Sequence, residues 1–337
     1  MIESIHFQNF KALRAATLPL APFTLIVGPN GSGKSTAMEG LRFLWDPSAY
    51  RYERVVTAGW EREADASIEV VIKCLDAGTS ARVISGLDFK GSFGPVQEGE
   101  TQLRESIKKR LANFRVFHFD PNALARPVQT QQKTELGADG SNLAAVLNAL
   151  SGREPERFEA LNKELKRWLP EFDRVVFDFP GPGQVEFLLR TRLNHHRYRA
   201  SDLSHGTIFA LAYLTLAYLP EPPAIIGFEE PDQGIHPRLL SEIREGMYRL
   251  AYPQDFGETR ESVQVIATTH SPYLLDLYKE HPEQIVIAHK DENGVHFERL
   301  SEKDHISELL DGAPLGDIWF SGILGGVPAT HEDSRSQ

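Results

Sequence analysis

The stretch that decides the fold is Gly28-Pro29-Asn30-Gly31-Ser32-Gly33-Lys34-Ser35-Thr36. A short apolar run with branched side chains, Phe23–Val27, comes directly before it, and residues 34–45 have the pattern of a helix. Glycine lets the backbone curl so that successive N–H groups point inward at an anion. A strand, a glycine loop and a helix in this order begin an α/β nucleotide-binding unit.

The loop fits the pattern G-x-x-x-x-G-K-[ST], in which each part has a physical task. The N-terminus of the helix adds positive potential. Lys34 can reach the β- and γ-phosphates of a nucleotide, and the hydroxyl of Ser35 can ligate Mg²⁺. The residues expected to bind the nucleotide are Asn30, Gly31, Ser32, Gly33, Lys34, Ser35 and Thr36.

Two adjacent carboxylates end a second apolar strand. Ala224–Phe228 is followed at once by Glu229 and Glu230. Paired carboxylates at the end of a buried strand are costly unless a cation or a proton transfer accounts for them. One can hold Mg²⁺ and the other can deprotonate an attacking water. The alternative is a solvated strand end with two ordinary acids.

A third apolar strand, Val265–Thr269, ends in His270. Ligands of α/β sheets sit just past such strands, so a neutral imidazole there can hydrogen-bond a phosphate or the attacking water. Ser204 and Gly206 stand at the start of a predicted helix. An ordinary N-cap explains Ser204 locally. The alternative is that this open helix end receives a phosphate from another subunit.

Composition bounds the remaining possibilities. The 337 residues contain 36 Lys and Arg against 47 Asp and Glu, a net charge of −11, which argues against a broad electrostatic grip on nucleic acid but not against a local patch. The single cysteine, Cys74, excludes a disulfide framework and a Cys-rich zinc site and is typical of the cytoplasm. No membrane-spanning run or signal-peptide pattern is present, so we expect no membrane contact.

Taken in order, these motifs resemble those of the ABC-class ATPases. GPNGSGKST resembles the Walker A motif, LSHGT the signature, IIGFEE the Walker B motif, PDQGIHP the D-loop and IATTHSP the histidine switch. Within this class the chain is similar to the RecF/SMC/OLD-like branch, often described as predicted AAA-family ATPases of the AAA_21 type. The segments that carry this second likeness are IHFQNFKAL, VFHFDPNALARP, LGADGSNLAAVL and LGDIWFSGILGG.

The resemblance implies a P-loop NTPase fold: an ABC-ATPase head with a mixed central sheet flanked by helices and an antiparallel β subdomain. It also implies ATP and Mg²⁺ as cofactors and a homodimer that holds ATP between two heads arranged head-to-tail. Lys34 and Ser35 of one subunit would face Ser204 and Gly206 of the other across the γ-phosphate.

In such a site Glu229 would assist Mg²⁺, Glu230 would be the general base and His270 would sense the γ-phosphate. The chain departs from the family because Glu229 stands where Asp is usual. The glutamine of the family's Q-loop has no clear counterpart, and Asp120 and Gln129 in the loop after Phe119 are its candidates.

The expected organisation is a single head over residues 1–325 and a flexible tail over 326–337. The nucleotide core would comprise 1–46 and 201–290, with a β/helical lobe inserted at about 47–200. Neither an SMC-type coiled-coil arm nor a Toprim nuclease domain is expected. Helices are predicted over 101–112, 141–150, 154–168, 205–218, 237–250 and 272–279, a long loop over 121–139, and strands over 66–75, 81–89, 115–119, 173–179, 184–190, 224–228, 263–268 and 284–288.

The leading functional hypothesis is an ATPase that acts as a switch or motor for a partner in DNA maintenance, DNA repair or anti-phage defence. The effector, a nuclease or another protein, would come from a separate chain. One alternative is a nucleotide-gated clamp on DNA or protein with slow turnover, and a weaker one is the nucleotide-binding subunit of a transporter. Nucleic-acid contact stays open, with a short basic run at 108–110 and a cluster at His195, His196, Arg197 and Arg199.

Overall fold

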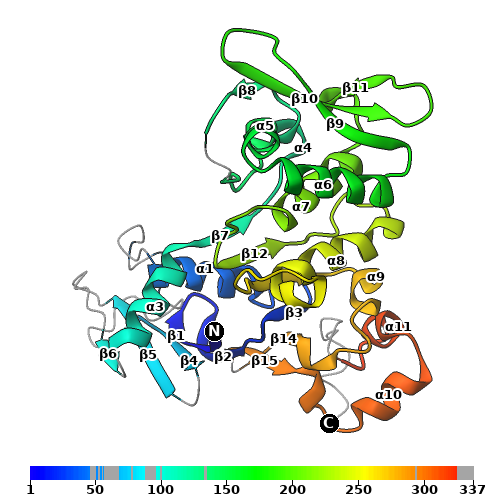
Figure 1. The fold of residues 1–337 in the computed structure, drawn as a ribbon. Coiled ribbons are helices and arrows are strands. Elements are labelled where there is room, and N and C mark those ends of the chain that lie inside the picture. Colours follow the sequence, from blue (N-terminus) through cyan, green and yellow to red (C-terminus); the bar gives the residue numbers. More distant parts are fainter. Residues whose placement is uncertain are drawn as a thin grey trace. The chain divides into compact units, whose positions relative to one another are not determined.

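The chain forms two compact units, which we call the terminal unit (Met1–Phe114 with Ile266–Gln337) and the middle unit (Arg115–Val265). The computed structural model describes residues 1–45, 51, 54, 56, 68–76, 79–87, 96–98, 101–132, 135–292 and 294–324. Figure 1 labels the elements of each unit. The polypeptide returns from the middle to the terminal unit within one strand, β13 (Gln264–Thr269). The expected tail, 326–337, lies outside the described residues.

An antiparallel sheet forms one part of the terminal unit. Its strand order is β2-β1-β4-β5-β6, and each strand pairs antiparallel with its neighbours. The side chains of Ile5, Phe7 and Phe10 in β1 are fully buried. This sheet confirms the predicted antiparallel β subdomain. The strands are β1 (Ile2–Phe10), β2 (Leu13–Pro19), β4 (Ile68–Asp76), β5 (Thr79–Leu87) and β6 (Val96–Glu98).

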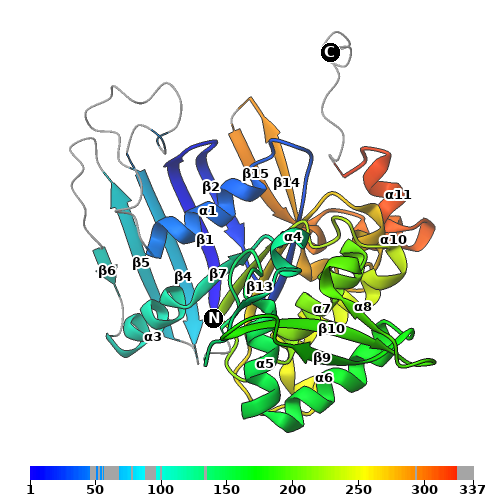
Figure 2. The ribbon, with the colours of Figure 1, turned by 90° about the horizontal axis from the view of Figure 1, so that it is seen from above.

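Helices α1 (Lys34–Trp45) and α3 (Thr101–Ala112) pack against this sheet and against each other (Figure 2). Gly40 sits in the middle of α1 because the helix crosses very close to β1. A Cβ at this position would lie 2.3 Å from Cε1 of Phe7. Glycine therefore sets how near α1 comes to the sheet.

The second sheet of the terminal unit carries the glycine loop. Its members there are β15 (Gly294–Arg299), β14 (Ile285–Asp291), β3 (Phe23–Val27) and the terminal-unit part of β13, in that order. β14 pairs in parallel with β3 and antiparallel with β15. This confirms the mixed sheet. All five side chains of β3 are buried, as expected for a central strand covered on both faces.

The last elements of the terminal unit surround the segment after β13. Helix α9 ends at Asp276, so the predicted helix 272–279 is too long, and the backbone continues in turns. The Asp276 carboxylate accepts a hydrogen bond of 2.7 Å from the Gly316 N–H and so fixes α11 to α9. The elements are α9 (Pro272–Asp276), η5 (Pro282–Gln284), η6 (Leu300–Glu302), α10 (Ile306–Gly312) and α11 (Leu315–Phe320).

The middle unit combines helices with two groups of strands. β9 and β11 both pair antiparallel with β10, and β7 neighbours β12. Its strands are β7 (Phe114–Phe117), β8 (Val128–Gln129), β9 (Phe172–Asp178), β10 (Gln184–Thr191), β11 (Arg197–Arg199) and β12 (Ile225–Glu229). Its helices are α4 (Pro121–Leu124), α5 (Leu143–Arg153), α6 (Pro155–Trp168), η2 (Ala200–Asp202), α7 (His205–Ala217), η3 (Pro237–Leu239), α8 (Leu240–Ala251) and η4 (Pro253–Phe256).

The prediction of a continuous loop over 121–139 is wrong, because α4 and β8 lie within it. Asp120 caps α4 by accepting a hydrogen bond of 2.8 Å from the Asn122 N–H, and Pro121 occupies the first turn. Both residues are favoured at a helix start. Four residues of helix are too few to produce a visible apolar period.

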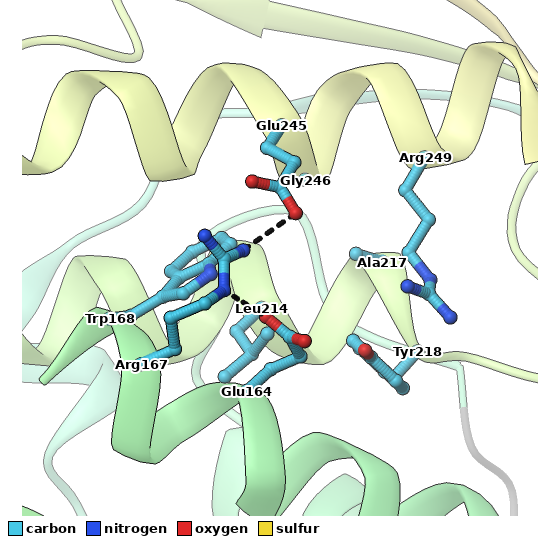
Figure 3. Close-up of a pocket in the computed structure, with 9 residues that line it drawn as sticks. All are labelled: Glu164, Arg167, Trp168, Leu214, Ala217, Tyr218, Glu245, Gly246 and Arg249. Carbon is cyan, nitrogen blue, oxygen red and sulfur yellow. Dashed lines mark hydrogen bonds and ion pairs between the residues drawn. The ribbon is translucent and has the colours of Figure 1, made fainter. Parts of the chain in front are cut away.

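Helices α6, α7 and α8 enclose a small pocket in the middle unit (Figure 3). Arg167 on α6 donates hydrogen bonds to Glu164 on the same helix at 2.7 Å and to Glu245 on α8 at 2.6 Å. Gly246 admits the ring of Trp168, which would lie 3.0 Å from a Cβ at that position. The pocket thus marks a tightly joined three-helix layer. In the part of the chain that the structure describes, no helix has the length and apolar character to traverse a bilayer.

Replacing Gly40 by Ala should destabilise the protein, although alanine is the better helix former in isolation. The new methyl group meets Phe7, a buried ring, and overpacking of this kind costs about 1–3 kcal/mol. The free energy of unfolding measured by urea denaturation tests this. Gly152→Ala in α5 is the matched control, because nothing lies within 4 Å of its added Cβ. Equal changes in the free energy of unfolding for the two variants would contradict the close approach of α1 to β1.

Candidate nucleotide-binding site

The glycine loop has the backbone that its sequence predicts. Gly31 and Gly33 have φ values of +79° and +89°, which side chains with a Cβ rarely adopt. A Cβ at Gly28 would lie 2.3 Å from the carbonyl oxygen of Ala288 and 2.4 Å from Oγ of Ser32. Glycine is therefore required both for the conformation of the loop and for its approach to β14.

Two polar groups are held inside this loop. The Lys34 side chain is 6% exposed, and its ammonium donates to the carbonyl oxygens of Gly28 at 2.7 Å and Pro29 at 3.0 Å. Ser32 is 1% exposed, and its hydroxyl has no hydrogen-bond partner among the described residues. A buried hydroxyl without a partner is unfavourable, and an anionic oxygen would satisfy it and attract the ammonium. The residues present therefore fit a phosphate group.

The other predicted nucleotide ligands surround these groups. Asn30 and Ser35 are exposed, and Thr36 is half-buried. Ser35 lies in the first turn of α1, where the backbone N–H groups of a helix are unsatisfied and favour an anion. The loop and the first turn of α1 thus form one continuous candidate site for phosphates and an associated cation.

His270 lies in the same unit as the loop, directly after β13, the neighbour of β3 in the sheet. Its side chain is half-buried. The turn that carries it is fixed by two side chains: Oγ1 of Thr269 accepts from the Ser271 N–H at 2.9 Å, and Oγ of Ser271 accepts from the Leu274 N–H at 3.3 Å. Side-chain hydrogen bonds from the residues before and after His270 thus fix the turn that carries it.

The two carboxylates end β12 in the middle unit. Glu229 is the last residue of the strand, and Glu230 follows with a φ of +48°. This left-handed conformation is uncommon for a residue with a Cβ and concentrates at functional sites. The carbonyl oxygen of Glu230 accepts from the Gln233 N–H at 2.9 Å, which closes a turn. Both side chains are half-buried, so they can reach a ligand.

An aromatic cluster holds β12 in place. Phe228 packs against Phe117 of β7 with ring centroids 6.0 Å apart and against Tyr213 of α7 at 5.3 Å. Phe119 packs edge-on against Tyr213 at 5.2 Å. Aromatic pairs at these separations add stabilisation beyond their buried area. The cluster joins β12, which carries the two carboxylates, to β7 and to α7.

One residue near the carboxylates was not predicted from the sequence: His118, which follows β7. Its Nδ1 lies 4.0 Å from Oε2 of Glu229. The available signal was a polar residue directly after an apolar strand, within VFHFDPNALARP. The two candidates for a Q-loop residue have other contacts: Asp120 caps α4, and Gln129 pairs with Gln184 on β10.

Ser204 is the N-cap of α7, as local reasoning predicts. Its Oγ accepts from the Thr207 N–H at 3.2 Å and lies 2.8 Å from the Thr207 hydroxyl, and the Ser204 side chain is exposed. A Cβ at Gly206 would lie 3.3 Å from the carbonyl oxygen of Gly234. The start of α7 therefore lies against the turn after Glu230, and both belong to the middle unit.

Two family models match the chain. One, described as "AAA domain, putative AbiEii toxin, Type IV TA system", matches residues 142–276. The other, described as "AAA ATPase domain", matches residues 1–125. The second range contains the glycine loop, and the first contains Ser204, Glu230 and His270.

Among curated proteins, the Old nuclease of Escherichia phage P2 is 21% identical over 380 residues, which cover 91% of this chain and 62% of the nuclease. The OLD nuclease of Thermus scotoductus is 44% identical over 41 residues, covering 12% of this chain and 8% of that protein. The chain thus spans less than two thirds of the length of these relatives. The solved SMC head domain from Thermotoga maritima has a TM-score of 0.52 at 15% identity, covering 88% of this chain and 98% of that domain.

Together these findings show that the chain is similar to AAA ATPase domains, to OLD nucleases and to an SMC head domain. The structural likeness supports an SMC head-like α/β fold. The fold class predicted from the sequence is therefore confirmed.

Replacing Lys34 by Met should abolish the stabilisation that MgATP confers on the protein. The substitution keeps an apolar stem in the buried position and removes the ammonium that faces the phosphate site. A ligand that binds the folded state raises the melting temperature in proportion to its binding free energy. We expect the parent and the exposed-surface control Lys109→Met to show a thermal shift with MgATP and Lys34→Met to show none. An equal shift in all three would contradict the assignment of this loop.

Proposed function

We propose that this chain is an ATP-driven switch in which two copies close head-to-tail around ATP and thereby control a partner protein. The observation that carries the nucleotide part is the buried ammonium of Lys34 in the same loop as the Ser32 hydroxyl, which has no hydrogen-bond partner among the described residues. Both groups suit an anionic oxygen better than the surroundings they have in the structure.

Within each copy, the loop N–H groups, Ser32 and Lys34 would hold the phosphates. The hydroxyl of Ser35 and the carboxylate of Glu229 would be oxygen ligands for Mg²⁺, which would neutralise charge on the phosphates. His118, 4.0 Å from Glu229, would help to orient that carboxylate.

Glu230 would accept the proton of the attacking water, and His270 would hydrogen-bond the γ-phosphate or that water. A carboxylate is a competent base when it is held within hydrogen-bond reach of its proton. The left-handed backbone at Glu230 supports this assignment, because the turn closed by Gln233 keeps a strained residue in one orientation.

The second copy would contribute the start of α7. Ser204 is exposed, and Gly206 leaves the backbone open at the helix N-terminus, where anions are favoured. ATP bound to one copy would then complete the surface that the other copy recognises. Hydrolysis would remove the shared phosphate contacts and favour opening, which is the behaviour of a two-state switch.

The partner would be an effector in DNA maintenance, DNA repair or anti-phage defence. This proposal is supported by the likeness to proteins named as nucleases and to an SMC head domain. A nuclease or another effector supplied by a separate chain would use the opening and closing of the dimer. The chain's low cysteine content suits the cytoplasm.

The head-to-tail arrangement predicts that two inactive variants restore each other. Lys34→Met damages the loop and Ser204→Arg damages the start of α7, so each homodimer has two broken sites. In a mixed dimer one site carries both changes and the other carries neither. Because half of the dimers in an equimolar mixture are mixed, we expect about a quarter of the parent ATPase rate. A mixture that stays as inactive as its components would contradict the shared site.

Glu230→Gln should bind ATP but lower the hydrolysis rate by about 10²- to 10⁴-fold, the usual contribution of a general base. Glu221→Gln is the matched control, because Glu221 is an exposed acid in the same unit. Rates of phosphate release from both variants test the assignment. Full cellular activity of Glu230→Gln would show that turnover is dispensable and would favour the alternative of a nucleotide-gated clamp.

A further inference from the structure

The middle unit carries a strongly cationic hairpin, which we call the basic hairpin (residues 190–199). Its sequence, RTRLNHHRYR, has four arginines and no Asp or Glu. It comprises the end of β10, a turn and β11, with Arg190 opposite Arg197 in antiparallel register. Every residue from 192 to 199 is exposed. In a chain of net charge −11 this is a local reversal of sign.

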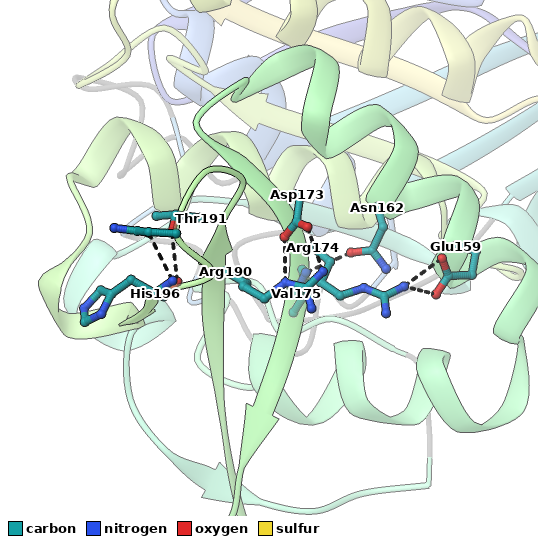
Figure 4. A network of polar contacts seen from close by, with 9 residues as sticks. Glu159, Asn162, Asp173, Arg174, Val175, Arg190, Thr191 and His196 are labelled. Carbon is teal, nitrogen blue, oxygen red and sulfur yellow. Dashed lines mark hydrogen bonds and ion pairs between the residues drawn. The ribbon is translucent and has the colours of Figure 1, made fainter.

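Two of the four arginines are tied to acids of the same unit. Arg190 makes a bidentate pair with Asp173 on β9, with N···O distances of 2.9 and 2.7 Å (Figure 4). This hydrogen bonding holds the pKa of the Asp173 carboxyl below its ordinary value. Arg199 lies 3.7 Å from the buried Glu186 on β10. These pairs anchor the base of the hairpin to its sheet.

The other two arginines, Arg192 and Arg197, present their charge to solvent. Both are exposed, and neither side chain has an ion pair or a hydrogen bond among the described residues. The backbone of Arg192 is nevertheless fixed, because its N–H donates to the carbonyl oxygen of Glu171 at 2.9 Å. Within the part of the chain that the structure describes, no acid pairs with these two cations, and they stand on a fixed backbone.

The turn between the strands is ordered by its own polar groups. Thr191 donates from its hydroxyl to Oδ1 of Asn194 at 2.5 Å, and the His196 N–H donates to the same oxygen at 3.2 Å. His195 has a φ of +56°, and the Thr191 N–H donates to the carbonyl oxygen of His196 at 2.8 Å. A preorganised turn loses little conformational entropy when it binds a partner.

Aromatic and apolar groups accompany the charge. Tyr198 is 41% exposed, and its ring meets that of His196 edge-on with centroids 4.7 Å apart. Leu193 at the turn is 96% exposed. Exposed cations next to exposed rings are the combination that binds phosphates and stacks on bases. An acidic protein surface could pair with the arginines, but it would offer the exposed rings nothing comparable to a base on which to stack.

We propose that the basic hairpin is a nucleic-acid contact, in which Arg192 and Arg197 bind backbone phosphates and Tyr198 packs against a base or sugar. A two-stranded ribbon is also narrow enough to enter a DNA groove. The hairpin leads through η2 to Ser204, so the contact is joined to the start of α7 by a few residues. This contact goes beyond the proposed switch, and its binding step requires no ATP hydrolysis.

The test is the affinity of the full chain for labelled duplex DNA, single-stranded DNA and RNA, without nucleotide and across a salt series. Arg192→Glu/Arg197→Glu should weaken binding at least about tenfold and lower the slope of log affinity against log salt by about 2, because two phosphate contacts are lost. Arg192→Gln/Arg197→Gln, a milder change, should weaken binding in the same direction. The three probes identify which nucleic acid the hairpin prefers.

The matched control is Arg126→Glu/Lys163→Glu, which has the same net charge but alters exposed cations outside the hairpin. It should bind within about twofold of the parent. Equal losses in both charge-reversed variants, unchanged binding by the hairpin variants, or no binding of any probe by the parent would overturn the proposal. Preferential capture of an acidic protein would also overturn it. Circular dichroism shows whether a variant has a folding defect. The ATPase rate without nucleic acid shows whether the proposed switch works, independently of the hairpin contact.

Discussion

The burial of the Lys34 ammonium inside its own loop is the constraint on which the rest of the candidate site depends. A buried cation is tolerated when acceptors surround it, and the carbonyl oxygens of Gly28 and Pro29 at 2.7 and 3.0 Å are two of them. The loop that carries these carbonyls turns back through Gly31 and Gly33, which have positive φ. The loop can lie so close to β14 only because Gly28 has no Cβ.

Local backbone conformation also fixes the candidate residues of the middle unit. Glu230 has a left-handed backbone directly after β12, whose residues before Glu229 are all buried, and an aromatic cluster fixes that strand within the middle unit. Ser204 and Gly206 begin a helix that lies against the turn after Glu230. Residues for holding phosphate and residues for acting on it are therefore each fixed by their own local structure. In our account, ATP between two copies brings these groups into one reaction centre.

The elements that the sequence predicts correctly are those that depend on neighbouring residues alone. The limits of β3 and α1 follow from an apolar run, a glycine loop and a helical pattern, and the structure confirms both as predicted. The N-cap role of Ser204 follows equally from its residue type. Strand β2 was missed because Leu13, Ala16 and Leu18 are its only buried residues and one of them is small. Helix α4 was missed because four residues show no period.

Other features depend on contacts between distant segments, which the local sequence does not determine. The proximity of His118 to Glu229 arises because β7 and β12 are neighbours, although the two residues are 111 positions apart in the chain. The register of β9, β10 and β11 places Asp173 beside Arg190 and Glu186 beside Arg199. These acids therefore pair with Arg190 and Arg199 and not with Arg192 or Arg197. The sequence predicts the chemistry of each motif, whereas the sheet pairing determines which side chains remain available.

The central claim, that ATP is bound between two copies, is tested most directly by sedimentation velocity of the Glu230→Gln variant. With Mg²⁺ and ATP, which this variant should bind without hydrolysing, the account predicts a dimer. With Mg²⁺ and ADP, which lacks the γ-phosphate that Ser204 of the second copy would contact, it predicts a monomer. The same sedimentation coefficient with ATP and with ADP would contradict the claim.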